Sequence, residues 1–232
     1  MYTEEEDEIL FPFCMQIIWK GQSCFQIVAQ RSKQEQVKIV TDPFDPVMMG
    51  LRISPLEADI ALISHGHPDH NNLKALKTEA FVISNPGEYE VKDVFVYGIS
   101  SFHDDAQGKE RGLNTIYTIE TEGIRICHLG DLGQHELTNE QIEKIGTVHI
   151  LMIPVGGEYT IGAKEAVKIV HQIEPEIVIP MHYAVAGSKV KLEKIDAFLK
   201  EMGVKEAVPQ QKFIVKERDL GKEEVQVIVL EP

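Results

Sequence analysis

The chain has 232 residues, of which 43% are hydrophobic and 26% are charged. These ordinary globular values exclude collagen-like, low-complexity and wholly disordered chains. The formal net charge is −14, from 23 Lys and Arg against 37 Asp and Glu, which argues against a protein whose main task is to hold a nucleic-acid backbone.

Residues 1–14 are predicted to form an N-terminal extension, and residues 15–232 a single domain. The chain starts with acidic residues where a signal peptide would be basic, and no stretch approaches the roughly 20 apolar residues that span a bilayer. The three cysteines show no C-x-x-C spacing and are interpreted as reduced thiols. We therefore expect a cytoplasmic protein without a membrane segment, and the sequence leaves a homo-oligomer open.

Short apolar runs separated by turns predict a β-rich first portion. The run at 59–64 is continuously apolar, which is the pattern of a strand buried on both faces, and it leads directly into His65. The predicted strands lie at 15–19, 25–28, 37–40, 59–64, 81–84, 94–99, 115–119 and 123–129.

Helices alternate with strands further along the chain. Thr138 and Gln141 have the spacing of a capping box, and Thr160 is predicted to cap a second helix. A third amphipathic segment is predicted to be a helix that ends at Gly203. The predicted helices lie at 139–145, 163–173 and 192–202, and the predicted strands at 148–155 and 176–180. This order predicts sheets with helices packed outside them.

The strongest signal for chemistry is the hexad His65-x-His67-x-Asp69-His70. Imidazole nitrogens and carboxylate oxygens bind divalent transition metals, and four donors in six residues can serve two neighbouring ions if the loop fans them apart. The alternative is a polar surface loop that happens to contain histidines. We favour the metal site.

Further donors follow the ends of later predicted strands: His103, Asp131 and His182. A lone histidine is more often an ordinary polar residue, so the argument rests on the repeated placement at strand ends. Asp131 lies between Gly130 and Gly133 in a loop expected outside the core, where a carboxylate could bridge two ions. Its alternative role is a plain Asx turn.

His135 follows the Asp131 loop closely enough to reach the same cleft, so contact with the ligands or the substrate is one hypothesis for its role. Tyr159, close to two glycines, is interpreted as a residue packed at a strand end, with a role in shaping the pocket as the alternative. The remaining histidines, His128, His149 and His171, are interpreted as structural.

The order of these motifs resembles the metallo-β-lactamase superfamily. More narrowly, the chain is similar to the predicted zinc-dependent hydrolases of that fold, the branch that contains ascorbate-6-phosphate lactonase. The similarity runs from about Met15 to the C-terminus, and it implies a four-layer αββα sandwich with the site at one edge of the two sheets. It is carried by Trp19-x-Gly21-x-Ser23-Cys24-Phe25, Asp42-Pro43, Pro86-Gly87-Glu88-Tyr89-Glu90, Pro154-Val155-Gly156-Gly157-x-Tyr159-Thr160 and Pro180-Met181-His182-Tyr183.

The resemblance also implies two divalent metal ions, taken to be Zn²⁺, with Mn²⁺ or Fe as alternatives. A hydroxide shared by the two ions would be the nucleophile, and Asp69 would orient it or move a proton. Leu132 follows Asp131 where many relatives carry Thr or Ser, and no β-lactamase substrate loops are recognised, so antibiotic hydrolysis is not implied. The implied ligands are His65, His67 and His103 for one ion, Asp69, His70 and His182 for the other, and Asp131 as the bridge.

The predicted function is therefore metal-dependent hydrolysis of a small-molecule ester, lactone, amide or phosphoester. One alternative is a phosphodiesterase or nuclease of the same fold, for which neither a clamping domain nor a basic run is visible. Another is a non-catalytic metal-binding or redox-sensing domain. A small-molecule substrate is expected, and nucleic acid is not.

Overall fold

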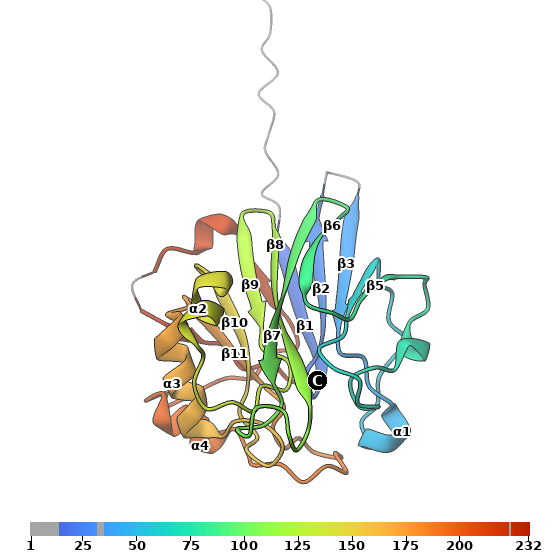
Figure 1. The fold of residues 1–232 in the computed structure, drawn as a ribbon. Helices are drawn as coiled ribbons and strands as arrows, with labels where there is room; N and C mark the ends of the chain where they lie inside the picture. Colours follow the sequence, from blue (N-terminus) through green and yellow to red (C-terminus); the bar gives the residue numbers. More distant parts are fainter. Residues whose placement is uncertain (1–13, 32–34, 223) are drawn as a thin grey trace, which may run out of the picture.

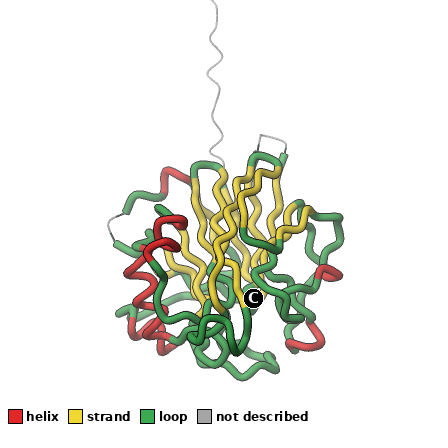
Figure 2. The backbone as a smooth tube through the Cα atoms, viewed as in Figure 1, coloured by secondary structure: helices red, strands yellow, loops and turns green. Residues whose placement is uncertain are grey.

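Two β-sheets packed face to face form the centre of the molecule in the computed structural model, which describes residues 14–31, 35–222 and 224–232. Helices lie against the outer face of one sheet and a shorter helix lies on the opposite side of the molecule (Figures 1 and 2), and the predicted four-layer αββα sandwich is confirmed. The predicted extension at 1–14 lies outside the described residues, apart from Cys14. Within the described residues, no helix has both the length and the hydrophobicity of a membrane span.

The first sheet has six strands in the order β12-β1-β2-β3-β4-β5. Alternate residues of β1 are buried, as expected for a strand with one face towards the second sheet. β12, β1, β2 and β3 pair antiparallel, whereas β3, β4 and β5 run parallel. The strands are β1 (Met15–Gly21), β2 (Cys24–Gln30), β3 (Gln36–Thr41), β4 (Ile60–Leu62), β5 (Phe81–Ile83) and β12 (Phe213–Val215).

The second sheet has seven strands in the order β13-β11-β10-β9-β8-β7-β6. β13, β11, β10 and β9 run parallel, and the pairs from β9 to β6 are antiparallel. Every residue of β10 and β11 is buried, because helices cover the outer face there. The strands are β6 (Gly87–Val91), β7 (Val94–Phe102), β8 (Leu113–Thr121), β9 (Ile124–His128), β10 (Ile150–Pro154), β11 (Ile177–Met181) and β13 (Gln226–Val227).

Helices α2, α3 and α4 lie outside the second sheet, and α1 lies on the opposite side of the molecule (Figure 1). The capping box predicted at Thr138 is present at the start of α2. The helical segments are α1 (Pro46–Met49), α2 (Asn139–Ile145), α3 (Ala163–Ile173), α4 (Asp196–Glu201), and the 3₁₀ turns η1 (Leu73–Ala75) and η2 (Glu217–Asp219).

Two helix predictions were wrong in detail. Thr160 does not cap α3, whose N-cap is Gly162 without a side-chain hydrogen bond. The third helix begins at Asp196 instead of residue 192. The backbone of Glu193 is used in other pairings, because its N–H donates to Gly156 O at 2.9 Å and its carbonyl accepts from the N–H of Ala184 at 2.8 Å.

The core between the sheets is apolar, and Tyr117 forms a polar link across it. The buried side chains include Trp19 and Phe25, each contributing roughly 1.5–3 kcal/mol through burial. The hydroxyl of Tyr117, on the second sheet, donates to Ile63 O at 2.9 Å. This bond connects the second sheet to the segment that carries the histidine hexad.

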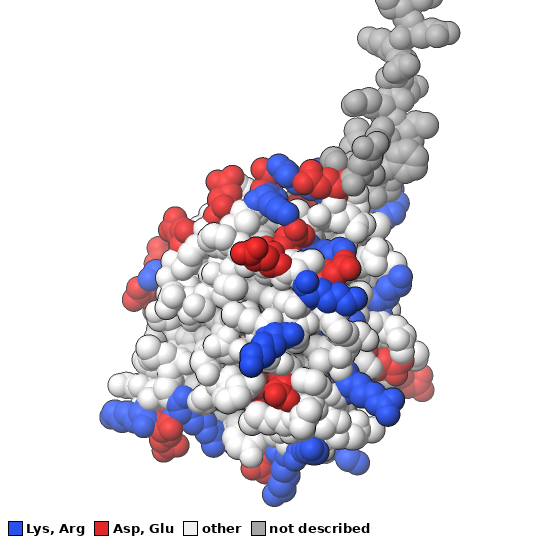
Figure 3. Space-filling view, turned by 90° about the vertical axis from the view of Figure 1, so that its right-hand side faces the viewer, with Lys and Arg blue, Asp and Glu red and all other residues white. Residues whose placement is uncertain are grey.

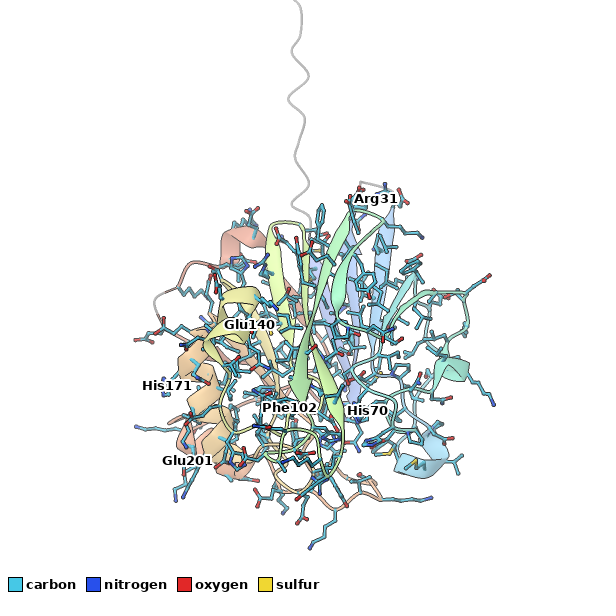
Figure 4. All side chains as sticks on the ribbon, in the orientation of Figure 1. Arg31, His70, Phe102, Glu140, His171 and Glu201 are labelled. Carbon is cyan, nitrogen blue, oxygen red and sulfur yellow. The ribbon has the colours of Figure 1, made fainter. Side chains whose placement is uncertain are left out.

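Strand directions explain where the predicted ligands meet. β1, β3 and β4 run in one direction within the first sheet, and β7, β9, β10 and β11 share one direction within the second. Their C-terminal ends therefore gather along one edge of each sheet. In Figure 4, His70, from the loop after β4 of the first sheet, and Phe102, the last residue of β7 in the second sheet, both lie in the lower half of the molecule.

Candidate metal centre

The hexad loop after β4 presents three imidazoles and a carboxylate. His65 is buried and its Nδ1 lies 2.9 Å from Ser64 Oγ, which sets the orientation of the ring. Its Nε2 lies 3.0 Å from Nδ1 of the half-buried His67. His103, at the end of β7, completes a first group, in which one ligand atom from each of these three histidines lies within 4.8 Å of the others.

Asp131 lies at the centre of a second group. Its Oδ2 is 3.1 Å from His70 Nε2, 3.3 Å from His182 Nε2 and 3.7 Å from His103 Nε2. Ligand atoms of His65, His70 and Asp131 also lie within 4.8 Å of one another. A carboxylate among imidazoles from different strand ends has the position that a bridging ligand requires.

Asp69 completes the set of predicted ligands. Its Oδ2 lies 3.6 Å from His70 Nε2, and its side chain is 23% exposed. The structure therefore brings all of the predicted metal ligands into one contiguous cluster. The sequence had placed Asp131 in a loop outside the core, and that was wrong, because Asp131 is only 2% exposed.

The residues fit divalent transition metals. Among the described residues, the buried Nε2 of His70 has no hydrogen-bond partner, although it points at the Asp131 carboxylate. Nε2 of His65 and Nδ1 of His67 lie 3.0 Å apart, so either one ring N–H donates to the other nitrogen or both nitrogens bind a cation. A mixed set of imidazole nitrogens and carboxylate oxygens suits zinc, manganese or iron.

Burial and charge act against each other in the metal-free cluster. Burial opposes the charged form of His70, but the Asp131 and Asp42 carboxylates outweigh it and raise the pKa of His70 well above its ordinary value. Burial would raise the pKa of Asp131, yet the His182 and His70 imidazoles hold it well below the usual range. Burial and the neighbouring His70 lower the pKa of His65 to about 3, so this ring is neutral and able to bind a cation.

Asp42, directly after β3, holds the hexad loop in place through its side-chain contacts. Its carboxylate accepts hydrogen bonds from Ser64 N and Ser64 Oγ, both at 2.7 Å, and its Oδ2 lies 3.3 Å from His70 Nδ1. The backbone of Asp42 has φ 40°, a left-handed conformation that a non-glycine residue adopts at a cost. The sequence analysis gave Asp42 no role, although the Asp42-Pro43 pair had been noted as part of a motif.

The turn between β1 and β2 supports the ligands of the second sheet. Ser23 Oγ donates to Asp131 Oδ1 at 2.8 Å, and Ser23 O lies 2.8 Å from His128 Nε2. Gln22 O accepts from the backbone N–H of His182 at 3.1 Å. The sequence analysis did not predict these contacts, although it had noted the spacing of Trp19, Gly21 and Ser23 as part of a motif.

Two glycines allow the ligand loops to approach closely. A Cβ at Gly133 would collide with the backbone of His103, and a Cβ at Gly156 would collide with His182 O. Both positions therefore need glycine for packing against a ligand-bearing segment.

The other predicted site residues lie at the periphery. His135 is exposed and its Nδ1 lies 3.4 Å from Asp105 Oδ2, so it is not part of the ligand cluster. Tyr159 is 42% exposed. His149 lies just before β10, where its Nδ1 accepts from the N–H of Arg125, in keeping with a structural role.

Replacing Asp42 by Asn is expected to lower metal affinity by about 10–100-fold, because supporting residues of this kind orient the ligands. Asn keeps the shape of the side chain but loses the charge opposite His70 and one of the acceptors for Ser64. The measurement is metal binding by isothermal titration calorimetry. Asp45→Asn is the control, since Asp45 caps α1 and Asn is an equally good cap. Equal affinity of Asp42→Asn and Asp45→Asn would contradict the prediction.

Comparisons with known proteins provide independent support for a metal site. Residues 16–182 match the family described as the Beta-lactamase superfamily domain. A "UPF0173 metal-dependent hydrolase" from Thermococcus onnurineus is 31% identical over 192 residues, which cover 70% of this chain and 82% of that protein. A protein of the same description from Thermoplasma acidophilum is 30% identical over 201 residues, 73% of this chain and 83% of its own length.

Solved structures show the same fold. A crystal structure from Thermotoga maritima, described as a candidate Zn-dependent hydrolase of the metallo-β-lactamase superfamily, has a TM-score of 0.74 and 37% identity, and covers 94% of this chain and 100% of that one. A metallo hydrolase from Ignicoccus hospitalis has a TM-score of 0.63 at 18% identity, covers 88% of this chain and 99% of that chain, and is similar in fold alone.

Proposed function

The chain belongs to the metallo-β-lactamase superfamily and is a metal-dependent hydrolase, and we propose that it cleaves a small-molecule ester, lactone, amide or phosphoester at a pair of divalent metal ions. The observation that carries this proposal is the position of Asp131, whose Oδ2 lies within 3.7 Å of imidazole nitrogens of His70, His103 and His182. We propose Zn²⁺ as the metal, with Mn²⁺ or Fe as alternatives, because the donors are imidazoles and carboxylates.

Residues of the chain have separate tasks in the proposed reaction. The two groups of ligand atoms around His65 and Asp131 would hold the divalent ions, which would supply a water with a pKa near 7 and polarise the substrate oxygen. Asp69 is the partly exposed carboxylate of the cluster, so it is placed to accept a proton from water or to pass one to the leaving group. Asp42 and Ser23 hold His70 and Asp131 in place and do not contact the substrate.

A small molecule is proposed instead of a nucleic acid. The net charge of −14 works against binding a phosphate backbone. On the face shown in Figure 3, Lys and Arg side chains are interspersed with Asp and Glu side chains and form no continuous basic surface. A nuclease of the same fold is the second candidate, because the metal chemistry proposed here would also cleave phosphodiesters.

A substrate panel tests the proposal. The zinc-loaded protein is incubated with lactones, thioesters, amides, small phosphodiesters, labelled RNA and single-stranded DNA under identical conditions. We expect turnover of at least one small substrate class that stops on chelation and returns on adding metal. Cleavage of the polymers at rates far above those of every small ester would favour the nuclease instead.

A further inference from the structure

We propose that Arg111, held against the ring of Tyr159 between two loops that pack on His103 and His182, recognises an anionic group of the substrate at a point away from the reacting bond. The substrate class would then be a small acid, carrying a carboxylate or phosphate in addition to the bond that is cleaved. This inference rests on the proposed function and deepens it.

The backbone of Arg111 is held close to a metal ligand. Asp104, the neighbour of His103, is buried and accepts four backbone N–H groups of the following loop, including that of Arg111 at 2.8 Å. The next residue, Gly112, accepts from the N–H of His103 at 3.1 Å. The other donors to Asp104 are Ala106, Gly108 and Glu110, at 2.8–3.1 Å. Arg111 is therefore fixed relative to His103.

The guanidinium of Arg111 contacts the loop between β10 and α3. Its carbon lies 5.2 Å from the centroid of the Tyr159 ring, and Nη1 donates to Glu158 O at 3.4 Å. That loop packs against His182, another predicted metal ligand, because a Cβ at Gly156 would collide with His182 O. Arg111 thus spans from the segment that carries His103 to the segment that packs on His182.

The charge of Arg111 remains available to a ligand. Among the described residues, no carboxylate forms an ion pair with its guanidinium, whereas Asp105, in the same loop, and Glu158, next to Tyr159, pair with other residues. Glu158 Oε1 lies 3.7 Å from Lys191 Nζ, and Asp105 Oδ2 lies 3.4 Å from His135 Nδ1. The Arg111 side chain is exposed to solvent, and Tyr159 is 42% exposed.

The chemistry of this pair suits an oxyanion. A guanidinium presents a planar fork of donors that matches a carboxylate or phosphate with two parallel hydrogen bonds. An aromatic face orients the fork through a cation–π contact and limits the entropy that is lost when a ligand binds. The metal ions would hold one end of such a substrate, and Arg111 the other.

Calorimetric binding of matched acids to the zinc-loaded protein tests the proposal. The probes are glutarate and adipate, which carry a carboxylate at each end, against valerate and hexanoate, which have the same chain lengths and one carboxylate. Metal content is measured on the same samples. We expect at least one dicarboxylate to bind about tenfold more tightly than its matched monocarboxylate, as a charge-assisted bidentate contact would give.

The variants distinguish recognition by Arg111 from a general effect of positive charge on binding. Arg111→Met is expected to abolish the preference, Arg111→Lys to retain part of it, and Tyr159→Phe to retain it because the ring remains. Lys109→Met is the matched control, since Lys109 is an exposed cation in the same loop. No preference in the native protein, the same preference in Arg111→Met, or an equal loss in Lys109→Met would overturn the proposal. Because binding is measured, this result stands apart from whether any ester in the substrate panel is cleaved.

Discussion

Replacing Asp131 by Asn is expected to abolish metal-dependent hydrolysis and to lower metal affinity by at least about 100-fold, more than the loss of a supporting residue. The carboxylate of Asp131 approaches the Nε2 atoms of His70, His103 and His182, so its charge faces both groups of ligands. An amide cannot carry that charge, and its NH₂ group would point a donor at a cation. The measurements are metal content by elemental analysis and turnover of the best panel substrate.

Asn is chosen over Ala because Asp131 is buried and accepts a hydrogen bond from Ser23 Oγ at 2.8 Å. Ala would leave the Ser23 hydroxyl without this acceptor, at a cost of about 1–3 kcal/mol, whereas the Asn amide oxygen can still accept. Asp105→Asn is the control, because Asp105 is an exposed carboxylate whose partner is His135. Native activity and native metal content in Asp131→Asn would show that Asp131 is no more than a turn residue.

Removal of the metal is expected to abolish hydrolysis and to lower the melting temperature by roughly 8–16 °C for each ion that is lost. Metal at about 1,000 times its dissociation constant stabilises the folded state by about 4 kcal/mol. For a chain of this size, 1 kcal/mol corresponds to about 2–4 °C in melting temperature. The attraction between His70 and Asp131 remains in the metal-free protein, so the fold is expected to persist after chelation.

Differential scanning calorimetry before and after dialysis against a chelator, and again after adding Zn²⁺, measures this effect. We expect about two equivalents of metal per chain after reconstitution, from the two groups of ligand atoms around His65 and Asp131. Asp42→Asn should show a smaller shift on adding the same metal concentration. Less than about half an equivalent of any transition metal after reconstitution would refute the dinuclear site.

Much of the fold and the candidate ligand set could be predicted from the sequence because both are encoded in local patterns. The apolar run before His65 indicates a buried strand, and the spacing of Thr138 and Gln141 produces the observed capping box. Donors placed directly after strands also indicate where ligands meet, since parallel strands end at the same edge of a sheet. These signals need only a few neighbouring residues.

Other features depend on contacts between distant residues and were visible only in the tertiary structure. Ser23 and Asp131 are 108 positions apart in the chain, and their hydrogen bond forms only because the two sheets stack. The edge strands β6, β12 and β13 were not predicted, because short and only partly buried segments become strands through their partners and carry little pattern of their own. Arg111 and Tyr159 likewise meet across two loops, so neither residue's neighbours in the sequence indicate the contact.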